Sequence, residues 1–137
     1  MFSSLSEQIV RDGEGATKLI KIKVKKAKSI QQAKKIAKSI ANSNLFKTAI
    51  YGEDANWGRI IMAIGRTYEK INQRKLKIYF GGYLVATNGK ANTKTNNSAI
   101  KKYLGKKEVE IQIDLAIGNS QADVLTCDLS HNYIAVS

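Results

Sequence analysis

Apolar and polar residues alternate strictly in two segments of the chain, which predicts half-buried β-strands. From Thr17 onward, Ile20, Ile22 and Val24 alternate with lysines, and the same alternation recurs over residues 109–115. Successive side chains of a strand point to opposite faces, so the first predicted strand buries one face and carries lysines on the other. Residues 122–128 are expected to return as a further strand after a turn.

Helical spacing replaces alternation in the middle of the chain. Ser29 and Gln32 form a capping-box pattern at the start of a predicted helix that runs to about Asn42. Its predicted core stripe repeats every three to four residues and consists of Ile30, Ala33, Ile36, Ala37, Ile40 and Ala41. A second helix is expected to open near Ile60, with Asp54 or Asn56 as its N-cap.

The remaining segments predict a short strand, a hairpin, a loop and a short helix. Residues 45–51 form an apolar run that favours a strand, and Gly81-Gly82 is a two-residue hairpin signal between residues 76–80 and 83–87. Residues 88–98 are polar and turn-forming, and a short helix is expected over 98–104. We therefore predict an α+β fold, a mixed and largely antiparallel sheet with helices packed on it, as a single domain over residues 1–137.

Composition is that of a globular chain. The hydrophobic share is 43%, and no apolar run reaches the ~20 residues that span a bilayer. The N-terminus lacks the basic and apolar regions of a secretory signal. The single cysteine, Cys127, has no partner for an internal disulfide, which fits a reducing compartment. A cytoplasmic location without a membrane partner is expected.

The formal net charge of +12 raises the alternative of a basic binding module for nucleic acid or other acidic partners. Residues 1–50 hold 11 basic and 3 acidic residues, a net charge of 11 − 3 = +8. Lysine dominates the basic residues and proline is absent, a pattern typical of a compositional bias. Because the lysines fall on the outer faces of one strand and one helix, solvation explains them adequately.

Few residues offer catalytic chemistry. His131 is the only histidine of the sequence, which rules out most histidine-based catalysis and a histidine-rich metal site. No metal site is predicted. Cys127 has no CxxC partner and is interpreted as a core or sheet cysteine. Thr17 stands where a phosphate-binding loop requires glycine before Lys18, so that motif is absent.

Two places keep a functional and a structural interpretation open. Glu14 lies between Gly13 and Gly15, where a carboxylate can approach an ammonium group or act as a general base; the alternative is an exposed turn. In residues 52–59, backbone N–H groups and Arg59 at a helix N-terminus would suit an anion. The alternative there is a capped helix start with Trp57 packed into the core.

Three long segments resemble the bifunctional glutamate N-acetyltransferase/ornithine acetyltransferase family of arginine biosynthesis: Ile9–Lys18, Ala37–Ile60 and Thr126–Tyr133. The resemblance implies acetyl transfer from N-acetylornithine to glutamate, and in some members from acetyl-CoA, with no resident cofactor. It also implies an αββα fold, autocatalytic cleavage into α and β chains, and a ping-pong reaction through the threonine that begins the β chain. Glu14 matches the family's substrate-binding glutamate.

The family's other catalytic parts have no match in this sequence. The nucleophile belongs to an Ala-Thr-Met or Gly-Thr-Met context upstream of the glutamate motif, whereas Thr17 belongs to that motif itself. The α chain would supply the oxyanion hole. Ser137 stands about where the family has a substrate-binding asparagine. We therefore expect the C-terminal part of a β chain with no catalytic residue of its own, inactive alone, whose partners are the α chain and the remaining β chain.

Overall fold

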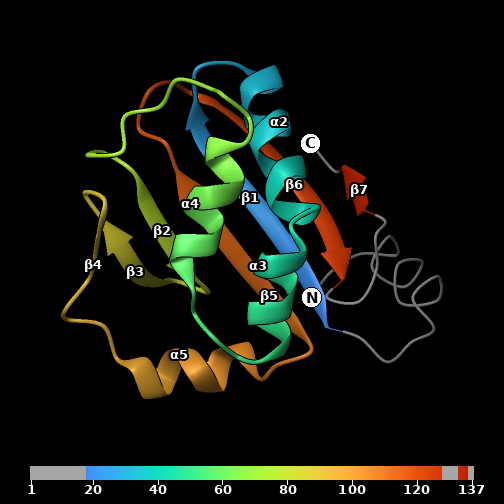
Figure 1. The fold of residues 1–137 in the computed structure, drawn as a ribbon, viewed down its shortest axis with the longest axis vertical. Helices are drawn as coiled ribbons and strands as arrows, with labels where there is room; N and C mark the ends of the chain where they lie inside the picture. Colours follow the sequence, from blue (N-terminus) through green and yellow to red (C-terminus); the bar gives the residue numbers. More distant parts are fainter. Residues whose placement is uncertain (1–17, 128–132, 136–137) are drawn as a thin grey trace.

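A computed structural model describes residues 18–127 together with the backbone of 133–135. The described elements are β1 (Leu19–Ala27), α2 (Ile30–Ala41), α3 (Asn44–Tyr51), α4 (Trp57–Gly65), β2 (Lys77–Phe80), β3 (Tyr83–Thr87), β4 (Lys90–Ala91), α5 (Asn97–Leu104), β5 (Glu108–Asp114), β6 (Ser120–Cys127) and β7 (Tyr133–Ala135). The strands form one seven-stranded sheet in the order β4-β3-β2-β5-β1-β6-β7 (Figure 1).

The sheet is mixed and largely antiparallel, which confirms the predicted fold class. Strand β1 pairs with β5 in parallel and with β6 in antiparallel orientation. The other described pairs are antiparallel. A parallel pair requires a crossover connection, and here the connection contains helices α2 to α5 and the β2–β4 strands.

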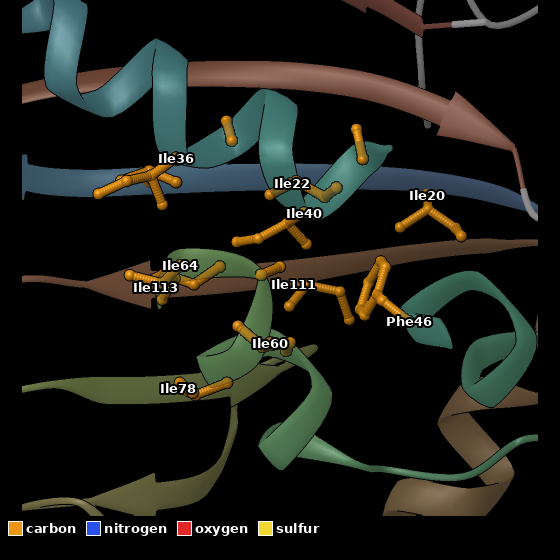
Figure 2. Packing of buried hydrophobic residues seen from close by; sticks show 14 of the residues in the cluster. Ile20, Ile22, Ile36, Ile40, Phe46, Ile60, Ile64, Ile78, Ile111 and Ile113 are labelled. Atoms are coloured by element: carbon orange, nitrogen blue, oxygen red, sulfur yellow. The ribbon is translucent and has the colours of Figure 1, made fainter. Parts of the chain in front are cut away.

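Helices α2, α3 and α4 lie against one face of the sheet (Figure 1). Strand β1 turns Ile20, Ile22 and Val24 toward this face, and all three are fully buried. Figure 2 shows isoleucines from β1, β5 and β2 meeting Ile36, Ile40, Ile60 and Phe46 from the helices. The described part is thus one helical layer on one sheet, and the αββα arrangement of a whole enzyme stays a prediction.

Helix α2 begins where the capping pattern predicts, with two differences. Ser29 Oγ accepts from Gln32 N at 3.1 Å, as expected of an N-cap. The Gln32 side-chain oxygen, however, accepts from Lys28 N at 2.8 Å instead of from Ser29 N. Ile30 was assigned to the core stripe and this is wrong: it is 53% exposed, because the first residue of the helix lies beyond the packed turns.

The strand predicted over residues 45–51 is wrong, since this segment is helix α3. Ser43 Oγ caps it by accepting from Phe46 N at 3.1 Å. The buried residues Phe46, Ala49 and Ile50 are spaced three and four apart, so one helical face is buried. A short apolar run fits either structure, and the cap residue was the signal that separates them.

The hairpin and the neighbouring short helix follow the prediction closely. Gly81 and Gly82 take φ angles of +61° and +96°, which glycine adopts without strain. A side chain at Gly81 would meet the Tyr103 ring of α5, whose hydroxyl accepts from Glu110 N at 2.7 Å. The segment 88–98, expected to be only loop, includes the exposed strand β4 and the first turn of α5.

The opposite face of the sheet carries charged side chains. Lys21, Lys23 and Lys25 alternate with the buried residues of β1 and are half-buried. Lys21 Nζ lies 3.6 Å from the Asp123 carboxylate, and Lys26 Nζ lies 3.5 Å from Asp114. Among the described helices, none is both long and apolar enough to cross a membrane.

Candidate functional site

The predicted substrate-binding residue, Glu14, lies outside the described residues, as do His131 and Ser137. The structure describes the chain from Lys18, where the glutamate motif ends. Lys18 Nζ donates a hydrogen bond to Leu104 O at the end of α5. Leu19 N donates to Lys107 O at 2.7 Å, which ties the start of β1 to the start of β5.

Two buried polar residues lie on the helix-covered side of the sheet near this end. Thr126 is fully buried and pairs with Ile20 across β6 and β1. Lys47 on α3 is only 3% exposed and follows Phe46, which belongs to the same apolar core cluster as Ile20. Neither residue is without an interaction partner.

A buried lysine needs compensation, because desolvating an ammonium group costs several kcal/mol, roughly, unless it is paired. The sequence alone predicted no role for Lys47, although this residue lies within the segment Ala37–Ile60 that carries the family resemblance. The burial of a lysine depends on the residues that pack around it, and the sequence alone does not give these. Lys47 is thus a buried basic residue of α3, on the helix-covered side of the sheet.

The block at residues 52–59 has the structure of a capped helix start. Asn56 is the N-cap of α4, and its side chain accepts from Arg59 N at 3.3 Å. Arg59 Nη1 donates to Leu45 O at 2.6 Å, so the guanidinium joins α4 to α3. Trp57 packs against the core while half-exposed. These contacts favour the structural interpretation over an anion site at Arg59.

Cys127 is a free and fully buried residue of β6, which confirms its interpretation as a sheet cysteine. Within the described residues, no three His, Cys, Asp or Glu side chains gather in a group that could hold a metal ion.

The fold defines an α+β sheet domain, and comparisons with known proteins identify its family. The ArgJ family model matches residues 1–137. The arginine biosynthesis bifunctional protein ArgJ of Brucella melitensis is 46% identical over 137 residues, which are 100% of this chain and 33% of that protein. The protein of the same name from Zymomonas mobilis is 46% identical over 133 residues, covering 97% of this chain and 32% of its own length.

A solved structure supports the same assignment. The crystal structure of the arginine biosynthesis bifunctional protein ArgJ from Bacillus halodurans matches with a TM-score of 0.83 and 42% identity, covering 93% of this chain and 60% of that chain. The chain belongs to the ArgJ family. It spans about a third of the length of the curated relatives that it matches.

Proposed function

We propose that this chain provides the Glu14-bearing, C-terminal part of the β chain of a cytoplasmic acetyltransferase that moves the acetyl group of N-acetylornithine to glutamate. Acetyl-CoA is a second acetyl donor in this proposal, and no resident cofactor takes part. The observation that carries the proposal is the match to the ArgJ family over all 137 residues.

The position of Glu14 in the chain supports its proposed role in binding substrate. Four peptide units separate it from Lys18, a reach of at most about 14 Å. The proposal is therefore that substrate binds within this reach of the start of β1, where Thr126 is buried beside Ile20. A carboxylate at this end can accept hydrogen bonds from the ammonium group of an amino-acid substrate, and such charge-assisted bonds are the stronger ones.

The catalytic groups come, in this proposal, from the other two-thirds of the family's length. A threonine nucleophile there takes the acetyl group from N-acetylornithine as an ester, and ornithine leaves with a free amine. The amine of glutamate then attacks the ester and releases the threonine hydroxyl. The oxyanion hole of the α chain stabilises the negative oxygen of each tetrahedral intermediate. The described residues then form the scaffold for the part of the site that binds the amine of the substrate.

The experiment is complementation. The 137-residue chain is purified alone, and also coexpressed with the part of the Brucella melitensis relative that precedes the matched region. Both samples are assayed for acetyl transfer from N-acetylornithine to glutamate. We expect no turnover by the chain alone and turnover by the complex. Turnover by the pure chain would show a nucleophile within these residues and would overturn the proposed division of labour.

A basic module for nucleic acid is the alternative, and the described lysines weigh against it. Lys21 and Lys26 lie beside the carboxylates of Asp123 and Asp114, so these charges are partly compensated within the sheet. The proposed function includes no nucleic-acid partner. A mobility-shift titration against random duplex DNA over a salt series checks this; a steep fall of affinity with salt would favour the alternative.

A further inference from the structure

A groove lies between the loop that joins α3 to α4 and the segment that runs from β4 into α5. It consists of two adjoining cavities of about 280 Å³ each, which share Ala55, Asn97 and Ile100 as lining residues. We call it the Trp57 groove, after the aromatic residue that lines its second cavity. Ligand sites for small molecules start at about this size.

The first cavity is lined by charges of both signs. Glu53 and Asp54 come from the α3–α4 loop, and Lys101 comes from α5. No ion pair within 4.0 Å joins any of the three to another described residue, although opposite charges face the same space. Charged groups that flank a cavity without pairing across it can each take a counter-charge from a ligand.

The second cavity provides an apolar and aromatic extension. Trp57 and Val85 line it, and the shared residue Ile100 is 2% exposed. Its polar rim is held in place, because Thr95 Oγ1 and Asn92 Nδ2 donate to Leu84 O at 2.8 and 2.9 Å. A ligand would therefore meet a preformed wall, which lowers the cost of ordering on binding.

We propose that the Trp57 groove binds a small zwitterionic amino acid. The ammonium group of the ligand contacts the Glu53 and Asp54 carboxylates, and its carboxylate contacts Lys101. Its uncharged side chain extends along Trp57. This proposal does not depend on the acetyltransferase proposal, because no step of it uses Glu14.

Fluorescence of the intact chain tests this directly, because Trp57 is the only tryptophan in the sequence. The probe is L-norleucine, whose unbranched side chain suits the second cavity. Norleucinamide lacks the carboxylate, and N-acetyl-L-norleucine lacks the ammonium. We expect a saturable change with norleucine in the millimolar range and binding weakened about tenfold for each derivative, as the loss of one charge-assisted hydrogen bond implies.

Substitutions test which charged side chains of the groove bind the ligand. Asp54→Asn and Lys101→Gln should each weaken norleucine binding about fivefold or more, because each removes one counter-charge. Lys102→Gln is the matched control, since this exposed neighbour on α5 does not line the groove, and it should bind as the unchanged chain does.

Amide chemical shifts of Ala55 and Ile100 provide a second readout, in case the indole fluorescence is insensitive to the ligand. Shifts at both residues that saturate together would support the site. No saturable response by either method up to about 100 mM would overturn the proposal, as would equal binding of all three probes.

Discussion

The two faces of the sheet are built from the same strands but from opposite chemistry. On the helix-covered face, Ile20, Ile22 and Val24 of β1 are fully buried. On the other face, the alternating lysines of the same strand are half-buried and lie beside acidic residues of β5 and β6. One strand therefore separates an apolar interior from a charged surface by the pleat alone.

The difference shows where the folding energy of this domain originates. Burial of apolar surface contributes roughly 25 cal/mol per Å², whereas exposed ion pairs contribute between nothing and about 1 kcal/mol. The charged face contributes less to stability than its number of ionic groups suggests. Substitutions at neighbouring positions on the two faces test this difference.

The largest expected effect is on the covered face. Ile22→Ala removes three carbon atoms from a fully buried site in the middle of β1, and we expect a loss of about 3–4 kcal/mol in the free energy of unfolding. Lys23→Ala, one residue along on the charged face, should cost less than about 1 kcal/mol. Urea denaturation followed by far-UV circular dichroism measures both. Equal losses for the two variants would contradict the division between the faces.

A smaller effect separates two acidic residues of the charged face. The Asp114 side chain is 9% exposed and pairs with Lys26, whereas the Asp123 side chain is 18% exposed and pairs with Lys21. We expect Asp114→Ala to lower the free energy of unfolding by about 1 kcal/mol and Asp123→Ala by about half as much, since burial reduces screening. Denaturation at low and high salt checks the ranking, and a larger loss at Asp123 would reverse it.

The smallest expected effect is a change of stability with pH at Tyr103, which joins α5 to β5. Burial raises the pKa of the Tyr103 hydroxyl above its usual value of 10.0, and the charge of Glu110 adds to the rise; the hydrogen bond from Glu110 N opposes both. The folded state thus favours the neutral phenol. This contribution is present below pH 10 and is lost as the pH rises through the raised pKa.

Comparison with Tyr103→Phe isolates that contribution. The free energy of unfolding of the unchanged chain should exceed that of the variant by about 1 kcal/mol at pH 8. The unchanged chain keeps the hydrogen bond that Glu110 N donates to the Tyr103 hydroxyl. This difference in the free energy of unfolding should narrow as the pH rises above ~10. A gap that widens with pH would mean that the folded state favours the phenolate.

Local patterns in the sequence predicted the strands and helices better than they predicted which strands pair with one another. Alternation placed Ile20, Ile22 and Val24 on one face, and Gly81-Gly82 fixed the hairpin. The parallel pairing of β1 with β5 joins residues about ninety positions apart, which no local pattern encodes. The apolar run at 45–51 failed because its length suits a strand and a helix equally, and tertiary packing with the Ser43 cap decided it.

The candidate site was predictable to a different degree. Glu14 follows from the family resemblance, since a carboxylate between two glycines is chemically ambiguous. Lys47 was missed because burial of a lysine depends on what packs around it, which becomes known only from the structure. For residues 52–59 the structure favours the structural interpretation over an anion site, because Arg59 bonds with Leu45 and Asn56.

Substitution of Glu14 in the complemented enzyme tests whether this chain supplies the substrate-binding carboxylate. Glu14→Gln keeps the size of the side chain and removes its charge, and Glu7→Gln in the same segment is the matched control. With kcat/KM for acetyl transfer from N-acetylornithine to glutamate as the readout, we predict a loss of about 50-fold or more for Glu14→Gln, the worth of one charge-assisted contact to an ammonium group. Glu7→Gln should leave kcat/KM within about twofold. Unchanged kcat/KM in the Glu14→Gln complex would contradict the claim that this chain supplies the substrate-binding carboxylate.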